Sequence, residues 1–309
     1  MARFVDGPVT VSVPATSANL GPGFDSLGLA LSLRDELTGT VTGSGLRIDV
    51  EGAGADDVPR DESHLVVRAM RAAFGLMNAE PPGLSLSCVN RIPHARGLGS
   101  SSAAIVGGLA LARGLVAGGQ LLLDDDAMFR LAAEIEGHPD NVAPALYGGF
   151  VISGREANDF YAAGSVVDPR ISAVVFIPST PVSTEAARGL LPDVVPHADA
   201  AANSGRTALL VAALARRPDL LHLATRDYLH QSYRTPAMPQ SLALVEALRG
   251  QEHPAIVSGA GPTVLAFTDG PVHPVAGWST GPESLMAQCP EGWTTLHLEV
   301  DTHGVVVTS

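Results

Sequence analysis

The segment RIPHARGLGSSSAAIVGGLALARG, residues 91–114, constrains the fold of this chain more than any other stretch. It follows residues 83–90, which predict a strand, and its Ala/Val/Leu/Gly half predicts a helix over residues 101–116. Gly97 and Gly99 can adopt left-handed backbone conformations and let a ligand approach the chain closely. The first turn of a helix leaves amide groups unpaired and carries partial positive charge, so this junction is typical of an anion site.

Three serines, Ser100, Ser101 and Ser102, stand at the start of that helix. They could donate hydrogen bonds to phosphate oxygens or ligate Mg²⁺; in the alternative interpretation, a serine merely caps the helix. The basic residues narrow the choice, because all 19 are arginine and the chain contains no lysine. A Walker A loop, a protein-kinase site and a pyridoxal Schiff base each need a lysine and are excluded. Nucleotide phosphates would have to be held by backbone amides, arginine and a metal ion.

The composition excludes several other classes of protein. A net charge of −13 opposes binding to nucleic acid or to an anionic membrane surface. Cys88 and Cys289 are far apart and belong to no Cys/His cluster, which argues against a zinc site and fits a reducing compartment. The first residues, MARFVDGPVTVSV, lack the apolar core of a signal peptide, and no apolar run long enough to span a membrane occurs. We therefore expect a cytoplasmic protein.

Hydrophobic periodicity predicts an α+β chain with two domains, residues 1–160 and 161–309. One helix is expected from Ser63, as its cap, to Met77, and another follows an acidic helix start at residues 124–126. HPDNVAPALYGG, at residues 138–149, is expected to be a loop. The expected strands are residues 9–13, 46–50, 83–90, 150–153, 171–179 and the two arms of AIVSGAGPTVLAFTD at 255–269.

Two further segments resemble ligand loops. Residues 14–31, PATSANLGPGFDSLGLAL, form an irregular chain directly after a strand, where ligand contacts are frequent. Asn19 and Asp25 are the polar groups that this segment could direct into a cleft, although Asn and Asp also serve ordinary turns. SGAGPTV, at residues 258–264, is a tight glycine turn between strands, and by itself it favours a structural interpretation.

Taken together and in this order, the three motifs resemble those of the GHMP small-molecule kinases, the galacto-, homoserine, mevalonate and phosphomevalonate kinases. PHARGLGSSSA is similar to that family's P-x-x-x-G-L-G-S-S-x-A motif, which holds ATP without a lysine. The resemblance runs from about residue 9 to residue 268. It implies an N-terminal domain like that of ribosomal protein S5 and a ferredoxin-like C-terminal domain. It further implies ATP binding by Pro93, His94, Ala95, Arg96, Gly97, Leu98, Gly99, Ser100, Ser101, Ser102 and Ala103, with His64 near the base.

Longer strings resemble the homoserine kinases within this family: VPATSANLGPGFDSLGLAL, EGHPDNVAPALYGGFV, STEAARGLLP and DYLHQSYR. The resemblance implies phosphorylation of the side-chain hydroxyl of L-homoserine in threonine biosynthesis, with Mg²⁺ held by Ser101 and Glu136. A homodimer is common among such enzymes, although no segment of the sequence identifies an interface. Two residues depart from the usual pattern, since Arg96 replaces a small residue and His64 stands where relatives read NLV.

An amino-acid substrate would account for the remaining polar residues. Its ammonium group needs a carboxylate, for which Asp25 is the candidate, and its carboxylate suits the planar forks of Arg188 and Arg234. The resemblance places Asn19 and Asn141 beside the attacking hydroxyl. An asparagine cannot accept a proton at neutral pH, so this implies a reaction without a dedicated side-chain base.

Several alternatives remain open at this point. Asp140, beside Asn141, could face the hydroxyl instead. A GHMP kinase for another small alcohol would lack a use for Asp25, and a silent sensor protein would be expected to lose Glu136 or the loop. A serine hydrolase built on Ser101 and His138 would need a G-x-S-x-G elbow around its serine, and the string GLGSSSA does not supply one at Ser101.

Overall fold

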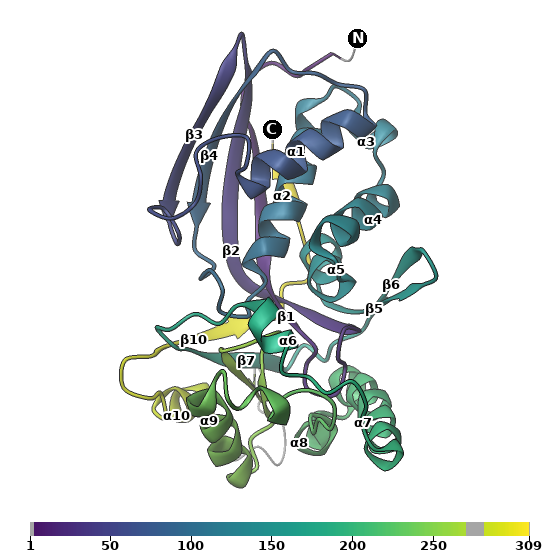
Figure 1. Ribbon diagram of the computed structural model, residues 1–309, viewed down its shortest axis with the longest axis vertical. Helices are drawn as coiled ribbons and strands as arrows, with labels where there is room; N and C mark the ends of the chain where they lie inside the picture. The colour runs from purple at the N-terminus through teal and green to yellow at the C-terminus, as the bar shows by residue number, and fades with distance from the viewer. Residues whose placement is uncertain (1–2, 270–280, 309) are drawn as a thin grey trace.

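The computed structural model describes residues 3–269 and 281–308, and these form two packed halves, each with its own sheet (Figure 1). The sheet of the first half has strand order β11-β1-β2-β4-β3, and β5 pairs with both β2 and β6. β3 and β4 run parallel, and the other pairs are antiparallel. Its strands are β1 Val9–Ala18, β2 Leu27–Thr42, β3 Gly45–Gly52, β4 Gly83–Asn90, β5 Phe150–Glu156, β6 Asp159–Ser165 and β11 Val306–Thr308.

Helices cover one side of this sheet (Figure 1). They are α1 Leu65–Leu76, α2 Ser100–Leu115, α3 Gly119–Leu122, α4 Asp125–Glu136 and α5 Pro139–Tyr147. α2 lies at the centre of the layer, in contact with α1, α4, α5 and the strands β1 and β2. Its side chains are buried along most of its length, as its continuous run of Ala, Val, Leu and Gly indicates. The loop at its N-terminus is therefore mounted on a rigid element.

The second half contains an antiparallel sheet with strand order β10-β7-β9-β8. Strands and helices alternate along the chain as in a ferredoxin-like β-α-β-β-α-β unit. The strands are β7 Ile171–Ile177, β8 Ala255–Val257, β9 Val264–Asp269 and β10 Thr294–Glu299. The helices are α6 Thr184–Arg188, α7 His197–Arg216, α8 Leu221–Ala224, α9 Pro239–Gly250 and α10 Pro282–Met286, with short 3₁₀ turns at Pro218–Leu220 and Ser232–Arg234.

The predicted α+β class and its two-part layout are confirmed. The acidic start of α4 is also confirmed, because the Asp124 carboxylate accepts a hydrogen bond from the Ala127 amide at 2.8 Å. The predicted division at residues 160 and 161 stays a prediction; β6 spans that point, and β11 returns from the end of the chain to the first sheet.

Three local predictions are wrong. Residues 14–31 are irregular only between 19 and 26, because β1 continues to Ala18 and β2 begins at Leu27. Ser63 does not cap α1, since the capping position is His64 and Ser63 hydrogen-bonds to Asp61 instead. Residues 138–149 are not a loop, because α5 occupies most of them. Pro139 sits in its first turn, where a missing N–H costs nothing. Pro144 lies inside the helix and cannot bond to the Asp140 carbonyl; Gly28 of β2 packs against that carbonyl, where a Cβ would lie only 1.9 Å away.

Candidate active site

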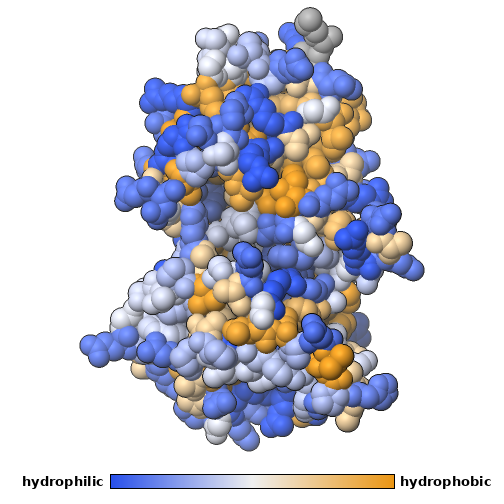
Figure 2. All heavy atoms as spheres, in the orientation of Figure 1, coloured by the Kyte–Doolittle hydropathy of each residue, from blue (hydrophilic) through white to orange (hydrophobic). Residues whose placement is uncertain are grey.

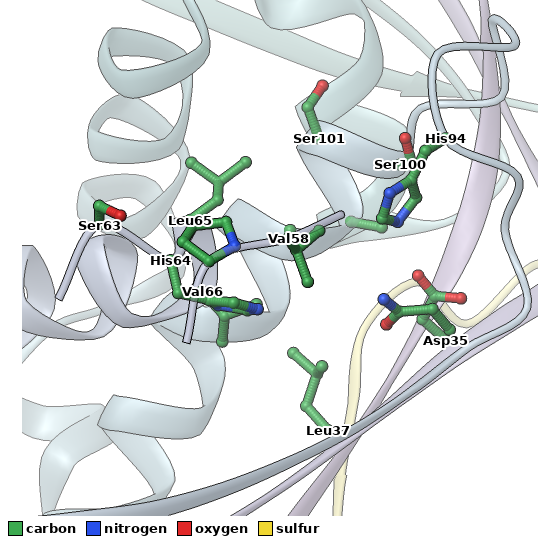
Figure 3. Close-up of a pocket in the computed structure, with 14 residues that line it drawn as sticks. Asp35, Leu37, Val58, Ser63, His64, Leu65, Val66, His94, Ser100 and Ser101 are labelled. Carbon is green, nitrogen blue, oxygen red and sulfur yellow. The ribbon is translucent and has the colours of Figure 1, made fainter. Parts of the chain in front are cut away.

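Two neighbouring cavities meet at the start of α2. The first, of about 330 Å³, is lined by residues from all three glycine-containing motifs and from α4, α5 and α6. The second, of about 290 Å³, lies between β2 and α1. Ser100 and Ser101 line both, so the N-terminus of α2 forms the boundary between them (Figure 3). The molecular surface in view is hollowed between the two halves (Figure 2).

The Gly/Ser loop presents the free amides of a long helix. Gly99 occupies the capping position of α2 with φ of 70°, no side chain caps the helix, and no acidic residue stands in its first turn. Gly97, with φ of 76°, packs so closely on the turn at residues 258–263 that a Cβ would lie 2.2 Å from the Ser258 carbonyl oxygen. The buried Leu98 anchors the loop between these glycines. Unpaired amides held in this way favour binding of a phosphate group.

Glu136, the last residue of α4, faces two serines of this loop. Its Oε1 accepts hydrogen bonds from Ser101 Oγ at 2.5 Å and from Ser102 Oγ at 2.9 Å. Within residues 3–269 and 281–308, no three His, Cys, Asp or Glu side chains gather as a metal cluster. A carboxylate and a hydroxyl beside a phosphate site nevertheless suit Mg²⁺, which is commonly held by one or two carboxylates together with substrate phosphates and water.

Asp25 and Arg188, predicted to bind opposite ends of an amino acid, contact each other. Arg188 Nη2 donates to Asp25 Oδ1 at 2.5 Å and Nη1 donates to Oδ2 at 3.0 Å, a bidentate pair. The side chains of Arg188 and Asp25 remain 36% and 38% exposed, so both charges are accessible, and Arg188 lines the first cavity. Donation of these hydrogen bonds to the Asp25 carboxylate raises the pKa of Arg188. The structure thus brings together two residues that lie 163 positions apart in the sequence.

Arg234 is buried beside this pair, with 1% of its surface exposed. Its Nη1 donates to the Gly259 carbonyl at 2.8 Å, while its Nε has no hydrogen-bond partner among the described residues. Burial and the neighbouring Arg188 lower the pKa of Arg234 to about 10, so it stays protonated at neutral pH. Both guanidinium groups lie over the ring of Phe24, at 5.4 Å for Arg188 and 5.7 Å for Arg234. Sequence reasoning missed Phe24, although it lies in the quoted string GPGFDS.

The two asparagines differ in how their side-chain amides are engaged. Both ends of the Asn19 amide are engaged, since Nδ2 donates to the Gly259 carbonyl at 2.9 Å and Oδ1 accepts from the Asp25 amide at 2.9 Å. Asn141 Oδ1 accepts from Thr16 Oγ1 at 2.8 Å, which leaves its Nδ2 group for a ligand. The side chains of Asn19 and Asn141 both line the first cavity. Thr16 was not singled out from the sequence, where nothing distinguishes it from a strand residue.

Asp140, the alternative to Asn141, also lines the first cavity and is 2% exposed. Its Oδ1 accepts a hydrogen bond from His138 Nδ1 at 2.8 Å. The Asp140 carboxylate is thus engaged by a side chain only two residues away, and this contact with His138 fixes the start of α5.

Strained backbone occurs in two segments that contribute residues to the first cavity. Asn19, Leu20, Asp25 and Ala95 all have positive φ, between 49° and 65°, although none is glycine. Such conformations are sparsely populated and gather at functional sites, where surrounding contacts impose them.

The two residues that depart from the family pattern have clear positions. Arg96 donates to the carbonyls of Pro178 at 2.8 Å and of Ser179, after β7, so its guanidinium ties the loop to the second half. His64 lines the second cavity, buried to 5% exposure, and its Nδ1 has no partner in the described part of the chain. Burial lowers the pKa of His64.

This fold and this loop define a class of protein, the GHMP small-molecule kinases. The family model for the GHMP kinases N terminal domain matches residues 64–149. Homoserine kinase of Streptomyces coelicolor is 54% identical over 299 residues, covering 97% of this chain and 94% of that protein. Homoserine kinase of Clavibacter michiganensis is 49% identical over 300 residues, covering 97% and 93%. The chain belongs to the homoserine kinase family, and it is an ATP-dependent kinase.

The fold of a solved relative agrees with this assignment. The crystal structure of homoserine kinase from Cytophaga hutchinsonii superimposes with a TM-score of 0.84, at 24% identity, and the match covers 100% of this chain and 99% of that one. Among the described residues, no helix combines the length and the hydrophobicity needed to cross a bilayer.

Proposed function

We propose that this kinase transfers the γ-phosphoryl group of ATP to the side-chain hydroxyl of L-homoserine, forming O-phospho-L-homoserine and ADP. The observation that carries this proposal is the cluster of Asp25, Arg188 and Arg234 beside Phe24, whose two arginines line the same cavity as the phosphate-binding loop. A substrate with an ammonium and a carboxylate group matches one anionic and two cationic side chains. A sugar or mevalonate would leave Asp25 without a use.

Binding of the amino acid would rearrange a charge pair that already exists. In the proposed complex, the ammonium group takes one oxygen of Asp25, and the substrate carboxylate draws the fork of Arg188 toward it. Arg234 would donate a further hydrogen bond to the substrate carboxylate from its Nε, which has no partner among the described residues. The Phe24 ring would support both guanidinium groups through cation–π contacts.

The phosphates of ATP would lie at the α2 N-terminus, on the amides of residues 97–102. Phosphoryl transfer needs in-line positioning and neutralisation of charge more than covalent chemistry. Asn141, held by Thr16, would donate its Nδ2 hydrogen to the substrate hydroxyl oxygen and orient it. Because an amide cannot take the hydroxyl proton, the proton would leave late, to the transferring phosphoryl group. Asn19 would hold Asp25 in place through its backbone amide.

Mg²⁺ is the metal that suits this site, and Ser101 Oγ and the Glu136 carboxylate are the residues that would hold it. Bound there, Mg²⁺ would neutralise charge on the β- and γ-phosphates. The substrates that the proposed reaction requires, besides Mg²⁺, are ATP and L-homoserine. We further propose a cytoplasmic location, supported by the two free thiols at Cys88 and Cys289, and a homodimer, as is common among homoserine kinases.

The test is ADP release with ATP, Mg²⁺ and a panel of L-homoserine, D-homoserine, mevalonate, galactose and L-threonine. Turnover confined to L-homoserine is the expected result. Loss of one charged hydrogen bond should reduce kcat/KM for L-homoserine by roughly 10- to 100-fold in Arg188→Ala and in Arg234→Ala. Arg217→Ala, which removes an exposed arginine paired with Asp219, is the matched control. Activity on an alcohol without an amino-acid head, and none on L-homoserine, would refute the proposal.

A further inference from the structure

The second cavity has apolar walls and a single carboxylate. Of the described residues that line it, Leu37, Val58, Leu65 and Val66 give it an apolar surface, and Asp35 is the only acidic side chain. Figure 3 shows the Asp35 carboxylate across the cavity from Leu65, with Ser100 and Ser101 on the adjoining side. An aromatic base attached to phosphates at the α2 N-terminus would therefore extend toward Asp35, between apolar surfaces.

Asp35 has a fixed orientation. It lies in β2 with 5% of its surface exposed, and its Oδ1 accepts hydrogen bonds from the Arg91 amide at 2.6 Å and the Ile92 amide at 2.8 Å. In the part of the chain that the structure describes, no donor lies within hydrogen-bonding distance of its other oxygen, Oδ2. Oδ2 therefore remains accessible from the cavity, and a base that covers it without supplying a donor would leave this carboxylate oxygen unpaired, at a cost in binding.

We propose that Asp35 is a specificity-determining residue, and that its Oδ2 accepts a hydrogen bond from the exocyclic 6-amino group of the nucleotide base. The inference rests on the proposed binding of ATP phosphates at the α2 N-terminus, from which the base reaches this cavity. Adenine carries an amino donor at position 6, whereas hypoxanthine and guanine carry a carbonyl oxygen there. A carbonyl oxygen facing Oδ2 would place two acceptors together, so the site rejects 6-oxopurines.

The neighbouring polar groups are consistent with this orientation. His64, on the α1 side of the cavity, is a buried imidazole whose Nδ1 has no partner among the described residues. Burial lowers the pKa of His64, which favours its neutral form. Asn90, near Asp35, directs its Nδ2 group to the Ala53 carbonyl at 3.1 Å instead of to the cavity. Among the described residues that line this cavity, Asp35 is the one carboxylate, the group that accepts from an amino substituent and repels an oxo substituent.

The wild-type protein provides the first test. Calorimetric titration with ADP, inosine diphosphate and N6,N6-dimethyl-ADP compares a base with two 6-amino hydrogens with two bases that have none. We expect both analogues to bind about 10- to 100-fold more weakly than ADP, the effect of one hydrogen bond to a charged group. Equal binding of ADP and inosine diphosphate would overturn the inference.

Asp35→Asn provides the second test, because the amide keeps an acceptor for Arg91 and Ile92 and turns an NH₂ donor toward the cavity. The ratio of kcat/KM for ATP to that for inosine triphosphate, with L-homoserine, should fall by at least about tenfold. Asp49→Asn, which changes an exposed aspartate on β3, should leave the ratio unchanged. An unchanged ratio in Asp35→Asn refutes the inference. A protein that prefers ADP in the titration but does not phosphorylate L-homoserine would refute the proposed function and leave this inference standing.

Discussion

The hydrogen bond from Thr16 to Asn141 makes a sharp prediction about the chemical step. Thr16 is fully buried, and its only side-chain hydrogen bond in the described residues is to Asn141 Oδ1, at 2.8 Å. Thr16→Val keeps the shape and the β-branch but removes the donor, so the Asn141 amide is free to rotate or flip. A neutral hydrogen bond contributes about 0.5–1.5 kcal/mol, so we expect kcat for L-homoserine to fall roughly 2- to 12-fold.

The effect should appear in kcat and leave the KM for ATP unchanged, because Thr16 lines neither cavity. Steady-state kinetics with both substrates varied would separate the two. Thr16→Ser, which restores the hydroxyl, should recover most of the activity. Thr10→Val is the matched control, since it removes a threonine hydroxyl of the same strand that lies 3.0 Å from Thr38 Oγ1. A Thr16→Val enzyme with wild-type kcat would refute the orienting function of this bond.

Two further predictions concern the phosphate and metal sites. Glu136→Gln should lower kcat/KM at least about tenfold and raise the Mg²⁺ concentration needed for half-maximal activity. Glu134→Gln, which changes an exposed residue of the same helix, should have neither effect. An unchanged Mg²⁺ titration of Glu136→Gln would contradict the metal assignment. Gly97→Ala should abolish ADP binding by calorimetry, because its Cβ would lie 2.2 Å from the Ser258 oxygen, while Gly118→Ala, equally strained at φ of 75° but in open space, should bind ADP normally.

The sequence predicted elements whose signals are local. Residues 83–90 form β4 as expected, and the residues before α2 form a loop with Gly99 as its cap, because glycine and alternation act within a few positions. α5 was missed because its two prolines and its polar start indicate a turn. Its stability depends instead on burial and on Gly28, which lies in a distant strand.

In the candidate site, too, the sequence identified residues with local signals but not the contacts that distant residues make. Motif strings identified Asp25, Arg188 and Arg234, and the structure brings these three together around one ring. The strings carry no information on partners, so the direct pairing of Asp25 with Arg188 could not be foreseen. Sequence patterns did not identify Thr16 and Asp35, because each is a single polar residue in a strand. The importance of each arises only from the groups that the fold places opposite it.

The pKa of Asp35 also predicts how the free energy of unfolding changes with pH. Burial raises the pKa of Asp35 from 3.8 to about 6, against the lowering effect of the Ile92 and Arg91 amides. A carboxyl group with a higher pKa in the folded state binds its proton more tightly there. Its contribution to stability is therefore full below about pH 4 and is lost as the pH rises to about 6. Two pKa units correspond to about 3 kcal/mol, by which the ionised Asp35 destabilises the folded protein at pH 8.

Asp35→Asn removes that ionisation while keeping an acceptor for the two amides. We expect the free energy of unfolding at pH 8 to rise by up to about 3 kcal/mol, and the gain to disappear at pH 4. Urea unfolding of both proteins at pH 4, 6 and 8 would measure this. A variant less stable than wild type at pH 8 would show that the bonds from Arg91 and Ile92 to the charged form outweigh its desolvation. If the variant is instead more stable and has lost its preference for adenine, the buried carboxylate is a cost in stability borne for selection of the nucleotide.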